Sequence, residues 1–409
     1  MGPSFFDKYN VKQFYKCMDK LIGITIGLKS IDESLWVNGI KLNAAMLYML
    51  IEKIEGYTPI LLDTSGNIED LSKIKFWDVN KFKTDKIANR FKELDILIQL
   101  GTTLQDRVVK DLKSKGLKCK IVKYHCGNNY VIEMERIIFN SDKNIPMTWT
   151  EQQDESWYVP QQHMHNKDYY SITGRNKSIA VPFVWDPYFL DLRKQEIENI
   201  GSSRVDYLPS NDLKRIMSFE PNNNVVKFSM PLILLAEQSL RNGSDFSRLS
   251  VCSGQTMFKN TGFLESLKIL DIYKKGKIKY LGRYPIVDIL TTDTDVVLSH
   301  QWDNPLNYLY LDVMYFGYPL VHNADMIQDG GYYYKDFEIK EGAKMLDWVL
   351  QNHDDNIEEY KEKNRPVLDR YTNKNEEIID VYKKLFDNLL NPGTHEMSYE
   401  YDWKTNSIL

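Results

Sequence analysis

A carboxylate within a predicted helix is the side chain best placed to do chemistry in this chain. Asp312 lies within the segment NPLNYLYLDVMYFGYPLVHN, residues 304–323. Upstream, an apolar run at 296–298 opens into the polar residues 299–303, which predicts a strand followed by a loop. In an open parallel sheet, ligands bind beyond the carboxyl ends of the strands, and helix N-termini offer free N–H groups to phosphate. Asp312 is therefore a candidate to accept hydrogen bonds from ribose hydroxyls, and a solvated or paired helix carboxylate is an equally good interpretation.

The same segment indicates which elements position this carboxylate. Asn304 is a good N-cap, and Pro305 suits the first helical turn, where an N–H group would have no partner. An apolar stripe at helical spacing follows. Gly317 can adopt the left-handed conformation that ends a helix, and Pro319 prevents its continuation into the next apolar run. We therefore expect a helix that begins at Pro305, carries Asp312 two turns later, and leads into a strand.

These residues resemble the donor-binding stretch of retaining glycosyltransferases of the GT-B type, in which two acidic residues separated by seven positions contact the donor. Asp312 matches the second acid, whereas the first position falls on Asn304, which forms hydrogen bonds but carries no charge. The longer run SHQWDNPLNYLYLDV, followed by GYPLVHN and GYYY, resembles an uncharacterised family of bacterial and viral proteins interpreted as glycosyltransferases. That resemblance extends over most of the chain.

Apolar runs that alternate with helical stretches predict two α/β units. In the first unit we expect strands at 21–28, 60–62, 96–100, 119–124 and 179–184, and helices at 40–54, 84–94 and 104–115. In the second unit we expect strands at 216–219, 249–252, 278–281 and 296–298, and a helix from about Pro231. Apolar residues in helical register predict a last helix at 376–390.

The resemblance implies that these units form the GT-B architecture, an α/β fold in which two Rossmann-like domains face a central cleft. It implies an acceptor-side N-terminal domain at 1–195, a nucleotide-sugar-binding domain at 196–375, and a C-terminal helix at 376–409 that crosses back to the N-terminal domain. It also implies a nucleotide sugar as co-substrate, with a UDP-sugar as the expected donor, and no cofactor.

Three further residues match positions that contact the donor in GT-B enzymes. Gly39 follows the first strand and loop, where the backbone approaches the donor diphosphate, and a turn glycine is the alternative. His125 follows a predicted strand and matches a histidine that faces the donor sugar, although a structural histidine is the more common case. Lys227 matches a basic residue that neutralises the diphosphate, and a surface lysine is the alternative. The expected donor-binding residues are Gly39, Lys227, His300, Asn304, Asn307 and Asp312, and the expected catalytic residues are His125 and Asp312.

The expected mechanism follows from the donor. Breaking a glycosyl phosphate bond develops negative charge on the departing diphosphate, so N–H groups, a cation and a dry cleft supply the catalysis. We assign this role to Lys227 and the helix beginning at Pro305, without a metal ion. Retention of anomeric configuration is implied by the resemblance. Inversion would instead require a base near the acceptor hydroxyl, for which Asp32 and Glu33 in the first loop are candidates.

Metal-binding patterns are weak in this chain. Asp293 and Asp295 have the D-x-D spacing that suits a divalent cation, but their position directly before a predicted strand favours a turn or a helix cap. His163 and His165 lack an evident third ligand. The cysteines form no CxxC pair, which favours a reducing compartment without disulfides or structural zinc; they are Cys17, Cys119, Cys126 and Cys252.

Length and charge agree with such an enzyme without selecting it. The chain has 409 residues and a mass of 48.1 kDa, which leaves room for two domains with separate cores. A net charge of −5 excludes a basic nucleic-acid coat protein. The longest apolar runs fall short of the roughly 20 residues that cross a bilayer, and the N-terminus, with Asp7 and Lys8, does not resemble a signal peptide. We therefore expect a soluble cytoplasmic protein, in the host cytoplasm if it is viral, without integral membrane association.

The acceptor is the least determined part of the prediction. Basic residues gather in two stretches of the first unit: Lys73, Lys75, Lys81, Lys83, Lys86, Arg90 and Lys92, then Lys110, Lys113, Lys115, Lys118, Lys120 and Lys123. They favour an acidic acceptor, such as phage DNA with hydroxymethylated bases or an anionic cell-surface or viral glycan, and solvated helix faces explain them equally well. A second alternative is an inactive protein that binds a nucleotide sugar without transferring it, because Asn304 replaces an acid.

Overall fold

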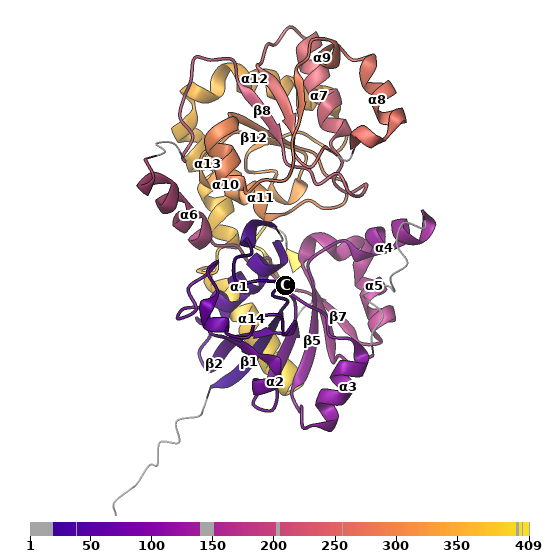
Figure 1. The fold of residues 1–409 in the computed structure, drawn as a ribbon, viewed down its shortest axis with the longest axis vertical. Helices are drawn as coiled ribbons and strands as arrows, with labels where there is room; N and C mark the ends of the chain where they lie inside the picture. Colours follow the sequence, from indigo (N-terminus) through magenta and orange to yellow (C-terminus); the bar gives the residue numbers. More distant parts are fainter. Residues whose placement is uncertain are drawn as a thin grey trace, which may run out of the picture.

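Two parallel sheets, each flanked by helices, form two domains that lie one above the other in the computed structural model (Figure 1). The structure describes residues 19–37, 39–139, 151–201, 205–255, 257–397, 401–402 and 404–408. The sequence expectations for Asp7, Lys8 and Cys17 lie outside these residues. Within them, no helix combines the length and the apolar character that a membrane crossing requires.

The N-terminal sheet has seven parallel strands in the order β3-β2-β1-β4-β5-β6-β7. Its strands are β1 (Lys20–Ile26), β2 (Tyr57–Asp63), β3 (Thr84–Lys86), β4 (Ile96–Gln99), β5 (Lys120–His125), β6 (Glu155–Tyr158) and β7 (Lys177–Ala180). The central strands read as continuous apolar runs because helices cover both faces of the sheet. Five consecutive residues of β1, from Ile22 to Ile26, are buried.

The second sheet repeats this winding with six parallel strands in the order β10-β9-β8-β11-β12-β13. Its strands are β8 (Arg215–Ser218), β9 (Arg248–Val251), β10 (Ile278–Tyr280), β11 (Val296–Ser299), β12 (Leu320–His322) and β13 (Tyr332–Tyr333). In both sheets the first strand of the domain is central and the order reverses beside it. Ligands bind outside the carboxyl ends of the strands at such a switch point, which in the second domain lies between β8 and β11.

The helices connect the strands and cover the sheets. The N-terminal domain contains α1 (Gly39–Ile51), α2 (Ile87–Arg90), α3 (Asp106–Ser114), α4 (Asn129–Ile138) and α5 (His163–Gly174). The rest of the chain contains α6 (Tyr188–Asn199), α7 (Met230–Arg241), α8 (Thr261–Lys268), α9 (Asp271–Lys274), α10 (Ile286–Asp293), α11 (Tyr308–Tyr315), α12 (Ile339–Asn352), α13 (Ile357–Tyr371) and α14 (Glu376–Leu390). A short antiparallel pair, β14 (Tyr401–Asp402) and β15 (Ser407–Ile408), completes the chain.

Two predicted helices differ from the observed elements. The helix expected to begin at Pro305 begins at Tyr308, because residues 305–307 are not helical and Asn307 is the extended N-cap residue. The backbone N–H of Asn304 donates to Oε1 of Gln301 at 2.6 Å. The helix expected at 84–94 was also wrong: its first residues form the edge strand β3 beside β2, and only the four residues of α2 are helical.

One hydrophobic cluster continues from the N-terminal domain into the second domain. It includes Ile24 of β1, Trp157 of β6, Tyr310 of α11 and Phe386 of α14. Separate clusters fill the space under the outer helices of each domain. The free energy gained when apolar surface is removed from water is roughly proportional to the area buried. The shared cluster therefore stabilises the contact between the two domains.

Trp185 lies at the junction where the chain crosses between the domains. Its backbone N–H donates to the Tyr371 carbonyl at 2.7 Å, and its carbonyl accepts from the Asn373 N–H at 3.1 Å. Its indole Nε1 donates to Oδ1 of Asp312, 2.8 Å away on α11. The linker after β7, the end of α13 and α11 therefore meet at one buried residue, Trp185, which is 1% exposed.

The last helix, α14, packs on the N-terminal domain (Figure 1). Phe386 is fully buried and contacts the rings of Tyr57 and Trp157. The Tyr57 hydroxyl donates to Asp387 at 2.6 Å. The C-terminal end of the chain thus completes the core of the domain in which the chain begins.

Replacing Phe386 with alanine should lower the free energy of unfolding by about 3–5 kcal/mol, because it removes a buried aromatic side chain and leaves a cavity. The matched control is Asp380→Ala on the same helix, where only the exposed ion pair with Lys384 is lost. We expect this control to lower the free energy of unfolding by about 0–1 kcal/mol. Urea denaturation followed by fluorescence measures both. Equal effects of the two substitutions would contradict the assigned packing.

The Trp185–Asp312 contact predicts a pH dependence of stability. Burial raises the pKa of Asp312 from 3.8 to about 7, and the indole hydrogen bond opposes this shift. The folded protein therefore favours protonated Asp312, so the wild type should lose stability as pH rises from about 4 to about 7. Asp312→Asn keeps an acceptor oxygen for the indole without a charge. We expect the stability of this variant relative to the wild type to increase across that window in denaturation curves; parallel pH profiles would contradict the prediction.

Candidate functional site

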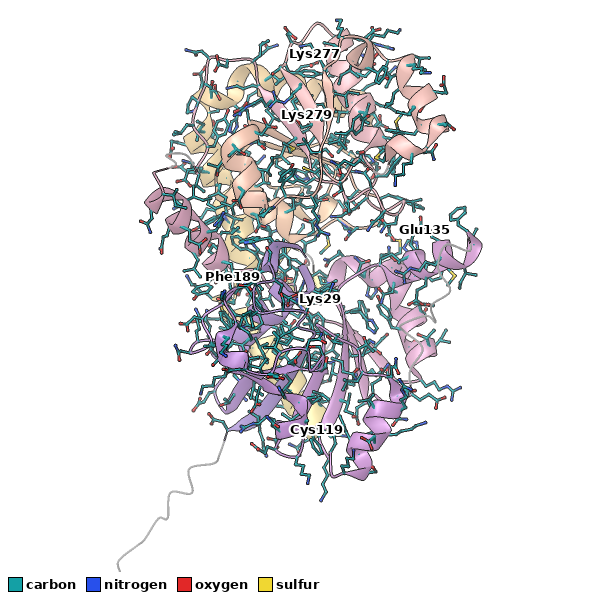
Figure 2. The ribbon with its side chains drawn as sticks, viewed as in Figure 1. Lys29, Cys119, Glu135, Phe189, Lys277 and Lys279 are labelled. Carbon is teal, nitrogen blue, oxygen red and sulfur yellow. The ribbon has the colours of Figure 1, made fainter. Side chains whose placement is uncertain are left out.

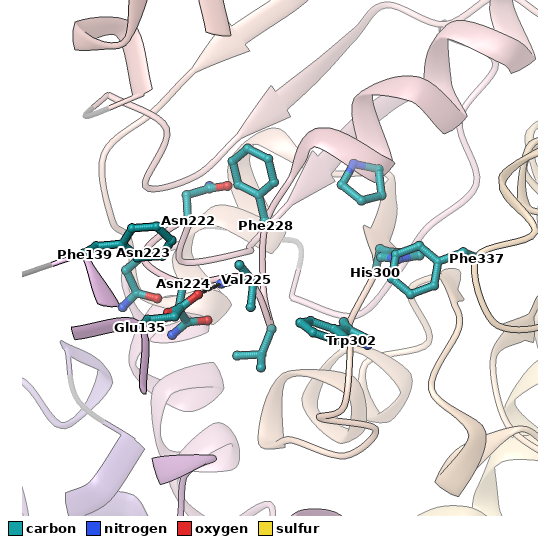
Figure 3. Close-up of a pocket in the computed structure, with 12 residues that line it drawn as sticks. Glu135, Phe139, Asn222, Asn223, Asn224, Val225, Phe228, His300, Trp302 and Phe337 are labelled. Carbon is teal, nitrogen blue, oxygen red and sulfur yellow. Dashed lines mark hydrogen bonds between the residues drawn. The ribbon is translucent and has the colours of Figure 1, made fainter. Parts of the chain in front are cut away.

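A cavity of about 540 Å³ lies between the two domains, at the carboxyl ends of β8 and β11 (Figure 3). The second domain contributes the loop between β8 and α7, the first turn of α7, two residues after β11, and one residue after β13. The N-terminal domain contributes the last turn of α4, which reaches toward the second domain (Figure 2). The lining residues are Glu135, Phe139, Asn222, Asn223, Asn224, Val225, Val226, Phe228, Pro231, His300, Trp302 and Phe337.

His300 is the predicted donor-binding residue that lines this cavity. It is 2% exposed, and its Nδ1 lies 2.7 Å from the Tyr334 hydroxyl. Phe337 packs edge-on against the ring, with 4.5 Å between the ring centroids. Burial lowers the pKa of His300 to about 4, so the ring is neutral at physiological pH. Its Nε2 atom is buried and has no hydrogen-bond partner among the described residues, which leaves it available to a ligand.

Two side chains of opposite charge, the buried Glu220 and the half-buried Lys227, belong to the segment that lines the cavity. Glu220 follows β8 and is 1% exposed, with one carboxylate oxygen 2.5 Å from the Ser299 hydroxyl. Burial raises the pKa of Glu220 and lowers the pKa of Lys227, while the charge of each partner opposes the shift of the other. The Lys227 ammonium lies 5.3 Å from the centre of the Tyr310 ring. Lys227 is therefore no freely solvated surface lysine.

Sequence reasoning found Lys227 but missed Glu220 and Glu135. Glu220 stands at the carboxyl end of a predicted strand, seven residues before the lysine, and that position was a usable signal. Glu135 lies in an ordinary amphipathic helix, and its Oε1 accepts a hydrogen bond from the Val225 N–H across the domain interface at 3.0 Å. No local pattern marks such a contact, because it exists only once the domains are together.

Two predicted donor-binding residues, Gly39 and Asn307, lie at the N-termini of α1 and α11, and a pair of hydrogen bonds connects these two helices. The Tyr308 hydroxyl donates to Oδ1 of Asn43 at 2.7 Å, and Nδ2 of Asn43 donates to the Gly39 carbonyl at 2.8 Å. Asn307 carries two buried side-chain atoms without partners in the part of the chain that the structure describes. Nothing lies within 4 Å of a Cβ built on Gly39, so the described structure leaves open space beside it.

The loop between β11 and α11 is hydrogen-bonded to the N-terminal domain. Nε2 of Gln162 donates to Oδ1 of Asn304 at 3.1 Å, and Nε2 of Gln161 donates to the Leu306 carbonyl at 3.0 Å. Nδ2 of Asn128 donates to the Asp303 carboxylate at 2.9 Å. Asn304 stands at the first of the two positions that are acidic in the resemblance. Its side chain thus forms a contact between the domains.

His125 and Asp312 do not line the cavity. His125 is 3% exposed and stacks on Tyr170, with 3.8 Å between the ring centroids. Its Nδ1 lies 3.3 Å from Nδ2 of Asn129, and burial lowers its pKa well below the usual value. Asp312 is 6% exposed, and one of its oxygens is bound to Trp185. Both residues are therefore packed against other side chains outside the cavity.

The remaining acidic candidates are paired with basic side chains. Asp32 lies 2.7 Å from Lys75, and Glu33 forms an ion pair with Lys41. The D-x-D carboxylates bind arginines, Asp295 at 2.8 Å from Arg215 and Asp293 with Arg248. Among the described residues, no group of three or more His, Cys, Asp or Glu side chains is placed to hold a metal ion.

No residue of the two basic stretches of the N-terminal domain lines the cavity. The helix α3, which carries Lys110, Lys113 and Lys115, stands at the end of the domain opposite the second domain (Figure 1). Lys123 is 4% exposed, and burial lowers its pKa to about 7. Several other members form ion pairs: Lys73 with Asp70, Lys75 with Asp32, Arg90 with Glu93, Lys115 with Asp111, and Lys120 with Asp154.

Solved structures of glycosyltransferases share this fold. A glycosyltransferase from Rickettsia africae ESF-5 superposes with a TM-score of 0.52 and 12% identity, covering 92% of this chain and 100% of that one. Sucrose-phosphate synthase from Thermosynechococcus elongatus gives 0.52 and 12%, covering 90% and 99%. A mutant O-GlcNAc transferase from Thermobaculum terrenum gives 0.53 and 14%, covering 91% and 69%. The expected GT-B architecture, with two Rossmann-like domains facing a central cleft, is thereby confirmed.

Comparison of sequences places the chain in a family. No curated protein matches it significantly. A family match extends over residues 22–386, which includes nearly all strands and helices of both domains. The chain therefore belongs to the family described as "Protein of unknown function (DUF2827)".

Proposed function

We propose that this protein is a glycosyltransferase that moves a sugar from a nucleotide sugar to a hydroxyl acceptor. The observation that carries the proposal is the interdomain cavity at the carboxyl ends of β8 and β11. Its wall contains Nε2 of His300, which has no hydrogen-bond partner among the described residues, and Lys227 lies between two residues that line it. Open α/β sheets bind ligands at this place. The likeness to solved glycosyltransferases supports the same reaction class.

In the proposed reaction, the bond between the sugar and the diphosphate breaks and negative charge develops on the departing phosphate. Lys227 and the N–H groups at the start of α11 stabilise that charge, and the buried surroundings strengthen their effect. Neutral His300 forms a hydrogen bond to a sugar hydroxyl. The proposal includes a UDP-sugar as donor, catalysis without a metal ion, and retention of configuration. The roles of His125 at the sugar and Asp312 at the ribose rest on the resemblance alone.

The proposed acceptor is a hydroxyl group. DNA with hydroxymethylated bases and a cell-surface or viral glycan are the two macromolecular classes that the sequence suggested. An acceptor that enters the cavity meets the last turn of α4 from the N-terminal domain and the loop after β8 from the second domain. Its reactive hydroxyl must therefore be reached between elements of both domains.

A thermal-shift and hydrolysis screen against nucleotides and nucleotide sugars, beginning with UDP-sugars, tests the proposal. A true donor at about 100 times its Kd should stabilise the fold by about 2.7 kcal/mol and slowly release nucleotide, also in the presence of EDTA. NMR of the released sugar reports its anomeric configuration. Glu220→Gln combined with Lys227→Met removes both buried charges together, so it avoids an unpaired buried ion. We expect this double variant to fold and to lose nucleotide release by at least about a hundredfold.

Lys279→Ala is the matched control, because Lys279 is an exposed lysine of the same domain on β10 (Figure 2). It should behave as the wild type. Stabilisation by a nucleotide sugar without any turnover would identify the inactive binding protein instead. A response to no donor, or a double variant with unchanged turnover, would contradict the proposed site.

A further inference from the structure

A histidine of the N-terminal domain contacts an aspartate of the second domain next to the interdomain cavity. Nδ1 of His165, on α5, contacts Oδ2 of Asp303. Asp303 directly follows Trp302, which lines the cavity. Because a carboxylate only accepts hydrogen bonds, the proton of the neutral ring lies on Nδ1. Nε2 then carries the lone pair, and it has no hydrogen-bond partner among the described residues.

The N-terminal domain holds Asp303 in a strained conformation. The φ angle of Asp303 is +54°, in the left-handed region that costs free energy for a residue with a Cβ atom. Nδ2 of Asn128 donates to its carboxylate at 2.9 Å and to its carbonyl at 3.2 Å. Asn128 is buried, and its Oδ1 accepts from Nδ2 of the buried Asn166 at 2.9 Å. Strained residues of this kind gather at functional sites, where the surrounding structure maintains them.

The imidazole of His165 is accessible from outside the protein. Its side chain is 40% exposed, whereas that of Asp303 is 19% exposed. The ring of Tyr130, on the neighbouring helix α4 (Figure 1), lies nearly parallel to it, with 6.3 Å between the centroids. The same helix carries Glu135, which lines the cavity; it lies about 7.5 Å beyond Tyr130 along the helix axis. The accessible histidine and the cavity thus share two neighbours, α4 and the loop after β11.

The other candidates for a base are engaged or buried. Asp32 lies 2.7 Å from a lysine, and Glu33 forms an ion pair with another. His125 is 3% exposed and stacks on Tyr170. His165 has an accessible ring, and its partner is an acid. A carboxylate at Nδ1 holds the ring in one tautomer and stabilises the positive charge that the ring gains when Nε2 takes a proton.

We propose that His165 is the base that takes the proton of the acceptor hydroxyl, and that Asp303 positions it. The inference rests on the proposed function and adds the acceptor side to it. The acceptor oxygen bonds to the anomeric carbon, and the bond from that carbon to the diphosphate breaks with its electron pair going to the phosphate. The hydroxyl proton passes to Nε2. Retaining glycosidases also activate the incoming hydroxyl with a base, so this role agrees with the proposed retention.

Donor hydrolysis tests the inference, because water then takes the place of the acceptor. Thermal stabilisation and nucleotide release are measured on the full-length protein with UDP-glucose, UDP-galactose and UDP-N-acetylglucosamine. We expect His165→Ala to lower the release rate by about a hundredfold or more and to leave stabilisation by the donor unchanged. Added imidazole should restore part of the rate, because it supplies the missing proton acceptor. It would not restore a lost structural contact.

Asp303→Asn keeps an oxygen that accepts from Nδ1 of His165 and removes the charge. We expect it to lower the release rate by about tenfold or more, again with unchanged stabilisation by the donor. The matched control is His163→Ala on the same helix, where the ring Nδ1 lies 2.9 Å from the Tyr158 hydroxyl. Its release rate should equal that of the wild type and should not respond to imidazole. Thermal midpoints without donor report whether each variant folds.

The remaining outcomes decide against the inference. Release at the wild-type rate by His165→Ala overturns it and identifies the contact with Asp303 as structural. Loss of release that imidazole leaves unchanged, or that accompanies weaker stabilisation by the donor, overturns it as well. Failure of the proposed function is distinguishable, because then no donor stabilises the wild type and none is hydrolysed; the inference falls with it. A donor that is hydrolysed equally by the wild type and His165→Ala rejects the inference alone.

Discussion

The burial of Trp185 is the constraint on which the relation of the two domains depends. Its backbone pairs with the chain on its return between the domains, and its indole binds the Asp312 carboxylate on α11. Leaving a buried carboxylate without a partner costs more free energy than its hydrogen bond contributes when it is formed. The contact therefore holds both Asp312 and the Trp185 indole in position. The position of α11, and hence of the loop before it, follows from this contact.

That loop forms one wall of the cavity. His300 and Trp302 precede α11 and belong to the second domain, whereas Glu135 belongs to the first. The hydrogen bond from the Val225 N–H to Glu135 and the bonds from Gln161 and Gln162 to the loop connect the two sides. The shape of the cavity therefore depends on the angle between the domains, and the shared hydrophobic cluster stabilises that angle.

The sequence was informative where one local rule determined the structure. Continuous apolar runs predicted the central strands, and apolar periodicity predicted α14 with its observed bounds, 376–390. The predicted start of α11 was wrong, because Asn304 and Pro305 satisfy every local rule for a helix start, yet Asn304 and Leu306 accept hydrogen bonds from the other domain. Edge strand β3 contains no apolar residue among Thr84–Lys86, so no pattern marked it. Glu135 and Glu220 acquire their roles only through partners distant in sequence.

The two positions of the acidic pair now have a common physical explanation. Asn304 accepts a hydrogen bond from Gln162 of the N-terminal domain, and Asp312 accepts one from Trp185 of the linker. Both side chains are thus engaged by elements outside the second domain. An acid at position 304 would accept the same bond but would add a negative charge near Asp303, which already binds Asn128 at the interface, and like charges at short distance are destabilising. An amide at this position keeps the hydrogen bond from Gln162 without adding that repulsion within the loop.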